Sequence, residues 1–158
     1  MSSPGNPASK PAGGGGEIVS VREFAFPRER VYAAFADPAR LAVWWGPQGF
    51  TNSIHEFDLR PGGAWRLTMR GPDGAEYHNE SAFTEVVPFE RIAFEHLEPV
   101  HRFVMTMTFA GDHGRTTLTW RMRFANDAEV ARLGNFLASA NEQNFDRLAA
   151  HLTPSHSP

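Results

Sequence analysis

Cysteine is absent from this chain of 158 residues. Its absence excludes disulfide bonds, thiolate catalysis and zinc sites built from cysteine, and leaves the cytoplasm as the default compartment. Long hydrophobic runs are absent too: no stretch reaches the roughly 18 apolar residues of a membrane helix, and the N-terminus lacks the apolar segment of a secretion signal. We therefore expect a cytoplasmic protein with no membrane insertion.

The chain also has no excess of positive charge. It carries 15 Lys and Arg against 18 Asp and Glu, a formal net charge of −3, so we expect no nucleic-acid partner. Hydrophobic residues make up 41% and charged residues 21%, which is typical of a single globular domain. Aromatic residues are plentiful, with 13 Phe and 4 Trp, and their bulk suits either a core or the wall of a pocket.

Several catalytic and metal-binding motifs are missing. There is no G-x-S-x-G nucleophile elbow, and the glycine pair at 62–63 is not followed by a helix that could hold a phosphate. The conceivable metal ligands are His55, His78, His96, His101 and Glu80. They follow none of the paired spacings of metal motifs, so we expect no metal and no cofactor.

Composition divides the chain into three parts. Residues 1–16 are rich in Pro, Gly and Ser and have no large apolar side chain except Met1, so we expect a flexible, disordered tail. Residues 17–153 carry the periodic apolar patterns of one folded domain. Residues 154–158 are expected to form a flexible C-terminus.

Alternation of apolar and polar residues predicts a sheet. A first strand over residues 17–26 is followed by two short helices, over 27–36 and 39–45. Six more strands are expected before Phe124, separated by turn sequences such as Gly-Pro-Asp-Gly at 71–74. Their short connections predict antiparallel pairing. The fold class is therefore α+β, with a sheet of about seven strands.

A long helix is expected at the C-terminus. Asn126 with Glu129 resembles a capping box, and helical spacing continues to about Leu152. At about 1.5 Å per residue this helix would be roughly 40 Å long, so it must cross the whole sheet. The small residues in its middle would leave room between helix and sheet: Gly134, Ala138, Ser139 and Ala140.

Four stretches of sequence carry a family resemblance. They are PRERVYAAF at 27–35, the segment from DP to WWGP at 37–47, DLRPGG at 58–63 and EVVPFERI at 85–92. In this order they resemble the START-like or SRPBCC superfamily, typified by the birch pollen allergen, and within it the bacterial branch named after the activator of heat-shock-protein-90 ATPase. The resemblance covers nearly everything after residue 17. It implies a helix-grip fold, in which a curved antiparallel sheet wraps around the C-terminal helix and encloses a cavity.

The resemblance implies several functions, because the superfamily includes lipid carriers, metabolite binders, polyketide cyclases and chaperone cofactors. We expect binding of a small, apolar or amphipathic molecule in an internal cavity between the sheet and the C-terminal helix. The alternative is a cofactor-free enzyme similar to polyketide cyclases or dehydratases. A third hypothesis is a chaperone ATPase cofactor or protein-interaction module. A homodimer through a sheet edge is compatible with all three.

Two histidines are predicted to face the interior. His55 alternates with Phe57 and Leu59, and His96 alternates with Ile92 and Phe94. An inward imidazole could act as a general acid or base. The simpler interpretation, which we favour, is that each histidine bonds to the backbone or to water near a strand end.

The strand over residues 76–86 is ambiguous. Tyr77, Asn79, Ser81 and Phe83 share one face, and His78, Glu80, Ala82 and Thr84 share the other. Alternation favours Tyr77 and Phe83 inward, but a bulge would exchange part of the set. If the protein is an enzyme, the candidate acid–base groups are His55, Tyr77, Glu80 and His96.

The aromatic and methionine residues are the main argument for a pocket, because aromatic rings form rigid walls and methionine adapts its shape. Many of them must simply fill the core. The predicted ligand-binding residues are Trp45, His55, Phe57, Trp65, Met69, Tyr77, Asn79, Phe83, Phe94, His96, Met105, Met107, Trp120, Phe136, Asn141 and Phe145.

Overall fold

The computed structural model describes residues 10–11, 16–98 and 102–154. Its strands form one antiparallel sheet in the order β1-β2-β8-β7-β6-β5-β4-β3. None of the helices in these ranges combines the length and the hydropathy that a membrane crossing needs. The elements are β1 (Lys10–Pro11), β2 (Glu17–Phe24), α1 (Arg28–Ala36), α2 (Pro38–Trp44), β3 (Thr51–Phe57), β4 (Ala64–Arg70), β5 (Glu76–Val87), β6 (Arg91–Glu98), β7 (Phe103–Asp112), β8 (Arg115–Phe124) and α3 (Asp127–Leu152).

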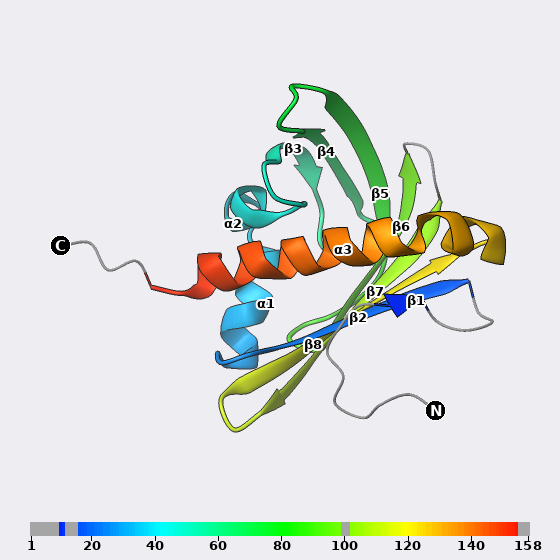
Figure 1. The fold of residues 1–158 in the computed structure, drawn as a ribbon. Helices are drawn as coiled ribbons and strands as arrows, with labels where there is room; N and C mark the ends of the chain where they lie inside the picture. The colour runs from blue at the N-terminus through cyan, green and yellow to red at the C-terminus, as the bar shows by residue number, and fades with distance from the viewer. Residues whose placement is uncertain (1–9, 12–15, 99–101, 155–158) are drawn as a thin grey trace.

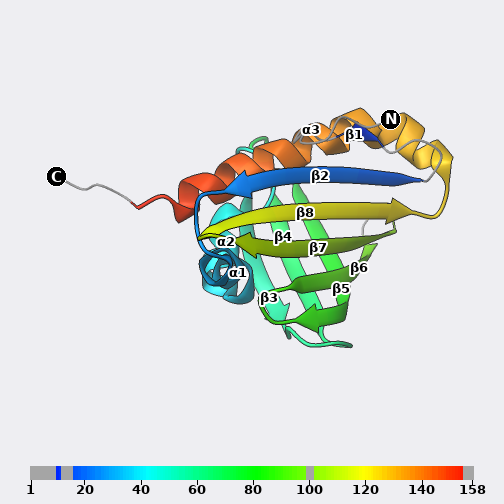
Figure 2. The same ribbon diagram turned by 90° about the horizontal axis from the view of Figure 1, so that it is seen from below.

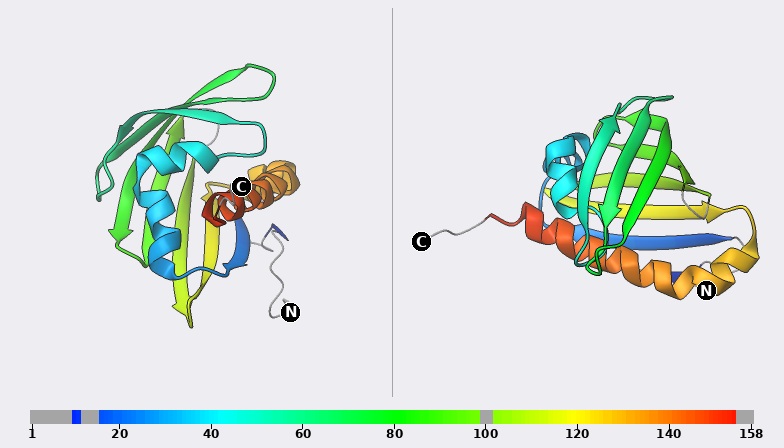
Figure 3. Two further views of the ribbon diagram at one scale, coloured as in Figure 1. Left: turned by 90° about the vertical axis from the view of Figure 1, so that its left-hand side faces the viewer. Right: turned by 90° about the horizontal axis from the view of Figure 1, so that it is seen from above.

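The sheet is curved, and α3 lies along its concave side (Figure 1, Figure 3). Consecutive strands from β3 to β8 pair as neighbours, β2 pairs with β8, and β1 lies beyond β2 at the edge. The short helices α1 and α2 pack together at one end of the sheet, next to α3 (Figure 2). The predicted α+β class is confirmed, with seven antiparallel strands, β2–β8, two short helices after the first of them and a long C-terminal helix.

A two-residue strand lies outside the predicted set. Lys10 pairs with Val19 and Pro11 pairs with Ile18, so β1 covers part of the free edge of β2. The disordered tail expected for residues 1–16 stays a prediction beside this short pairing. Edge strands offer unpaired main-chain groups to any extended segment, and composition does not reveal that pairing. The rest of that tail, apart from Gly16, and residues 155–158 lie outside the described residues.

Local capping explains where two helices begin. The Asp37 side chain accepts a hydrogen bond from the main-chain N–H of Ala39 at 3.0 Å, and Pro38 occupies the first turn of α2. The Asn126 side chain accepts a hydrogen bond from the main-chain N–H of Glu129, also at 3.0 Å, and α3 starts at Asp127. The predicted start of the long helix is confirmed.

An ion-pair cluster holds α3 against β2. Arg22 on β2 places Nη1 2.7 Å from Asp146 Oδ1 and Nη2 2.7 Å from Glu142 Oε1. Burial acts to lower the pKa of Arg22, but the hydrogen bonds to Asp146 and Glu142 outweigh it and the pKa is raised. The same guanidinium lies 5.4 Å from the centre of the Phe145 ring. The second half of α3 is thereby fixed to the sheet.

The aromatic core fills one end of the space under α3. The ring of Phe35 lies 4.8 Å from that of Trp44 and 5.0 Å from that of Phe109, both edge to face. The buried indole N–H of Trp44 donates to the carbonyl of Ala34 at 3.0 Å. Trp120 extends the cluster, with its ring 6.4 Å from Phe35. Under the middle of α3, between Phe136 and Asn144, the packing leaves a pocket.

The turn between β3 and β4 depends on one glycine. The N–H of Gly63 donates to the carbonyl of Arg60 at 2.8 Å. A Cβ atom on Gly63 would lie 1.9 Å from the carbonyl oxygen of Asp58, so no side chain fits there. Gly62 differs: it has φ +85°, but a Cβ atom would meet nothing within 4 Å.

Candidate functional site

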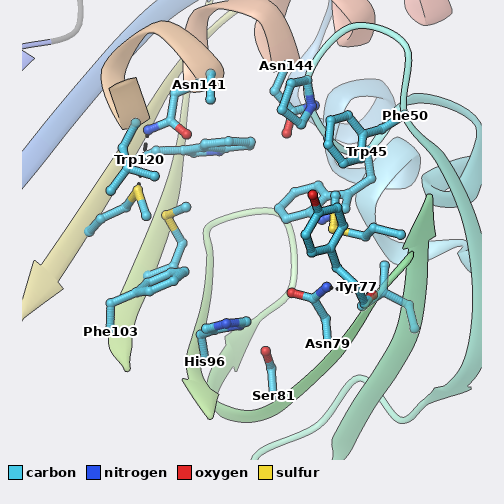
Figure 4. A pocket seen from close by; sticks show the side chains of 18 of the residues that line it. Trp45, Phe50, Tyr77, Asn79, Ser81, His96, Phe103, Trp120, Asn141 and Asn144 are labelled. Atoms are coloured by element: carbon cyan, nitrogen blue, oxygen red, sulfur yellow. Dashed lines mark hydrogen bonds between the residues drawn. The ribbon is translucent and has the colours of Figure 1, made fainter. Parts of the chain in front are cut away.

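A pocket of about 400 Å³ lies between α3 and the concave face of the sheet (Figure 4). Its mouth carries Tyr77 and Phe136, whose side chains are 42% and 71% exposed. The lining residues are Trp45, Gly46, Pro47, Phe50, Trp65, Leu67, Met69, Tyr77, Asn79, Ser81, Phe94, His96, Phe103, Met105, Trp120, Met122, Phe136, Leu137, Ala140, Asn141 and Asn144.

Aromatic rings form most of the deep wall. The ring of Trp45 lies 5.0 Å from Trp65, 5.4 Å from Trp120 and 6.5 Å from Phe94, measured between ring centres. Such a wall offers a large apolar surface at little cost in side-chain freedom. Burying an apolar molecule against it contributes about 25 cal/mol for each Å² removed from water.

The loop after α2 places Trp45 in the pocket, and α3 clamps this loop. Arg147 on α3 donates from Nη1 to the carbonyls of Trp45 and Gly46 at 3.0 Å and Pro47 at 2.9 Å. Its Nη2 donates to the carbonyl of Val43 at 2.9 Å. Gly46, with φ +98°, lets the chain turn under this guanidinium. Burial lowers the pKa of Arg147.

Strand β5 contributes a polar strip on the wall opposite α3. Tyr77, Asn79 and Ser81 point toward the pocket (Figure 4), which identifies the inward face of the strand that alternation left open. His96 pairs opposite Ser81 on β6, is 8% exposed and also lines the pocket. Its ring stacks on that of Phe103 at 4.8 Å. Hydroxyl, amide and imidazole groups thus meet along one wall.

His55 lies on the outer face of the sheet, so the expectation that it faces inward with Phe57 is wrong. The β3–β4 register shifts between Ile54 and Glu56, and this irregularity breaks the alternation that linked the two residues. His55 is exposed, and its Nε2 lies 2.8 Å from Thr68 Oγ1.

Glu80 and His78 also lie on the outer face. Glu80 Oε2 is 3.8 Å from Arg66 Nε, and His78 Nδ1 is 2.9 Å from Thr68 Oγ1. Glu80 therefore does not meet Tyr77 and His96 in the pocket. Among the described residues no group of three or more His, Asp or Glu could hold a metal ion, and His101 is not among the described residues.

Four of the predicted ligand-binding residues pack in the core. Phe57, Phe83 and Met107 surround a separate gap of about 10 Å³, roughly the space of one water molecule. Phe145 is fully buried, with its ring 4.8 Å from that of Trp120. These side chains support the pocket wall from behind.

Eleven predicted residues do line the pocket: Trp45, Trp65, Met69, Tyr77, Asn79, Phe94, His96, Met105, Trp120, Phe136 and Asn141. The lining residues outside the predicted set are Gly46, Pro47, Phe50, Leu67, Ser81, Phe103, Met122, Leu137, Ala140 and Asn144. Periodicity could have found some of them. Asn144 follows Asn141 by one helical turn, and Met122 alternates with Trp120.

Two indole N–H groups of the pocket wall have no hydrogen-bond partner within the described part of the chain, those of Trp65 and Trp120. The Trp65 ring lies flat on Phe83 at 5.8 Å and edge-on to Phe94 at 5.1 Å. These indoles therefore contribute shape and apolar surface, whereas the indole of Trp44 also contributes a hydrogen bond.

Comparison with known proteins gives a family and several similar structures. The family model described as Activator of Hsp90 ATPase homolog 1-like protein matches residues 25–153. A crystal structure from Chromobacterium violaceum is 29% identical, covers 89% of this chain and 99% of its own, and has a TM-score of 0.76. A solution structure from Arthrobacter aurescens is 21% identical, covers 92% of this chain and 90% of its own, and has a TM-score of 0.85.

A crystal structure of the AHSA1 protein from Silicibacter pomeroyi is 23% identical, covers 86% of this chain and 96% of its own, and has a TM-score of 0.71. The two matches below 25% identity show the fold alone. No curated protein matches the chain. Together, the family match and the structures confirm the resemblance carried by the four sequence stretches.

Proposed function

We propose that this chain, which belongs to the family of Activator of Hsp90 ATPase homolog 1-like proteins, binds a small and largely apolar molecule in the pocket under α3. The observation that carries the proposal is the pocket itself. About 400 Å³ of space is walled by aromatic and methionine side chains, with only a few polar groups turned into it. This is the composition of small-molecule sites, in which apolar burial supplies affinity and polar groups supply orientation.

The alternative of a cofactor-free cyclase or dehydratase has weaker support. Of its four candidate acid–base groups, Tyr77 and His96 line the pocket, whereas His55 and Glu80 lie on the outer face. Tyr77 and His96 stand on one wall. The polar residues that α3 contributes to the facing wall, Asn141 and Asn144, are amides, which do not titrate. This arrangement favours holding and orienting a molecule over proton transfer to and from it.

The family description names an activator of the Hsp90 ATPase, and this name refers to the protein after which the family is called. The pocket is the feature of this chain that supports a function, and it has the chemistry of a small-molecule site. A pull-down with the cellular chaperone tests the protein-interaction alternative separately.

Titration with Nile red, a neutral apolar dye, tests the proposal. We expect one dye molecule per chain with a rise in dye fluorescence. Ala140→Phe puts a ring into the pocket from α3 and should weaken dye binding at least tenfold. Ala131→Phe, on an exposed position of the same helix, should leave binding within twofold. Dye binding that is equal in both variants, or absent from the wild type, would overturn the proposal.

A further inference from the structure

The amide of Asn144 has a fixed orientation. Its Nδ2 lies 3.1 Å from the main-chain carbonyl of Trp44, which can only accept a hydrogen bond, so the nitrogen must face that carbonyl and the oxygen must face away. The side chain is 4% exposed and lines the pocket, and Figure 4 shows its oxygen turned into the pocket. Within the described residues no donor bonds to this oxygen.

The amide of Asn141, one helical turn earlier, is arranged in the same way. Its Nδ2 donates to Ser20 Oγ at 3.0 Å and to Met122 Sδ at 3.4 Å. Both N–H hydrogens are therefore engaged. The oxygen of this 7% exposed side chain is also turned into the pocket, with no donor to it among the described residues (Figure 4). The helix wall thus presents two hydrogen-bond acceptors to the open space of the pocket.

A ligand that fills the pocket excludes water from these two oxygens, and an acceptor then left without a donor costs about 1–3 kcal/mol. A ligand that supplies the donor removes this cost, and a ligand that brings another acceptor does not. Asn141 and Asn144 therefore discriminate between molecules of the same shape. They favour a molecule with a hydroxyl group over its ether or its hydrocarbon analogue.

The pocket carries no compensating charge. Among residues 16–98 and 102–154, its lining includes no Asp, Glu, Lys or Arg. Arg147 is close, but its Nη1 and Nη2 are engaged by the carbonyls of the loop after α2. A carboxylate or ammonium group placed beside Asn144 would lose its hydration without a permanently charged partner, because the one basic side chain of the lining, His96, lies on the sheet wall. These groups therefore favour a neutral ligand.

From these groups we infer that the pocket selects a neutral aromatic alcohol or phenol, whose hydroxyl donates a hydrogen bond to Asn144 Oδ1, with Asn141 Oδ1 as the neighbouring acceptor. The flat rings of Trp45, Trp65 and Trp120 favour an aromatic body. This inference rests on the proposed function and adds to it the chemical class of the ligand.

The test compares four probes of nearly the same size by isothermal titration calorimetry: naphthol, methoxynaphthalene, naphthalene and naphthoate. One neutral hydrogen bond contributes about 1 kcal/mol, so naphthol should bind the wild type about fivefold more tightly than methoxynaphthalene or naphthalene. Naphthoate should bind at least tenfold more weakly than naphthol.

Three variants locate the discrimination. Asn144→Leu should abolish the preference for naphthol over methoxynaphthalene and leave the affinity for methoxynaphthalene within about twofold. Asn141→Leu, which keeps the tie to Trp44, should reduce the preference. The matched control is Asn52→Leu, because Asn52 Nδ2 ties the carbonyls of Ala42 and Trp45 in the same region but does not line the pocket. It should keep the preference in full.

The outcomes separate the two claims. Equal binding of naphthol and methoxynaphthalene to the wild type, or tightest binding of naphthoate, would overturn the inference and leave the proposed function intact. A preference that survives Asn144→Leu unchanged would also overturn it. If Nile red binds but none of the four probes does, only the inference fails; if neither Nile red nor any of the probes binds, the proposed function fails as well.

Discussion

Arg147 is the residue whose removal should have the clearest structural consequence. Its guanidinium joins α3 to the loop that carries Trp45, through four contacts with main-chain carbonyls at 2.9–3.0 Å. All of these partners are neutral main-chain groups. Arg147→Ala should therefore release this loop and destabilise the fold.

The size of the effect follows from the donors. Nη1 carries two hydrogens for three carbonyls, so the four contacts count as about three hydrogen bonds. A bond from a charged donor contributes about 1.5–3 kcal/mol when buried, and the partial exposure of this site reduces that by roughly half. We expect Arg147→Ala to lower the free energy of unfolding by about 3 kcal/mol. Arg147→Lys, which cannot span the same set of carbonyls, should lower it by about 2 kcal/mol.

Urea denaturation, followed by tryptophan fluorescence and circular dichroism, measures this difference. The matched control is Arg132→Ala on the same helix, which loses one exposed ion pair with Glu129 and should cost less than about 0.5 kcal/mol. An Arg147→Ala protein whose free energy of unfolding lies within about 0.5 kcal/mol of the wild type would refute the clamp. In that case the loop would be held by other contacts.

Further predictions concern stability and its pH dependence. Gly63→Ala should prevent folding or cost more than about 3 kcal/mol in urea denaturation, whereas Gly62→Ala should cost only about 1 kcal/mol for its backbone conformation. Trp44→Phe should cost about 1 kcal/mol more than Trp65→Phe, because only the first loses a hydrogen bond, and equal losses would contradict the assignment. Burial lowers the pKa of His151 below 6.5, so the unfolded chain binds its proton more tightly. The free energy of unfolding should therefore decrease as the pH falls below 6.5, because protonation of His151 favours the unfolded chain. His151→Gln should make this decrease shallower between about pH 7 and pH 5. An equal pH dependence in the variant and the wild type would contradict this prediction.

Much of the fold was predictable because it depends on local patterns. The α3 start follows from one capping side chain, Asn126, and the sheet follows from strict alternation and short turns. The same alternation identified Trp65, Phe94 and Trp120 as residues of the concave face. These positions obey a two-residue period without interruption.

The remaining features depend on interactions that periodicity does not record. His55 lies outside because it is an extra residue of β3: Ile54 pairs with Leu67 and Glu56 pairs with Arg66. The orientation of the Asn144 amide could not be predicted, because it is set by a hydrogen bond to the carbonyl of Trp44, which is 100 residues away in the sequence. Phe145 and Phe136 both follow helical spacing, yet one packs in the core and the other lies at the pocket mouth. Their places depend on how α3 crosses the sheet.

The binding claim is tested most directly by nuclear magnetic resonance of the four tryptophan indole N–H groups during a titration with naphthol. Trp45, Trp65 and Trp120 line the pocket, whereas Trp44 is buried in the core with its N–H bonded to Ala34. Binding in the pocket should shift the three lining signals in a saturable way and leave the Trp44 signal almost unchanged. Saturable binding that leaves all three lining signals in place would contradict the account.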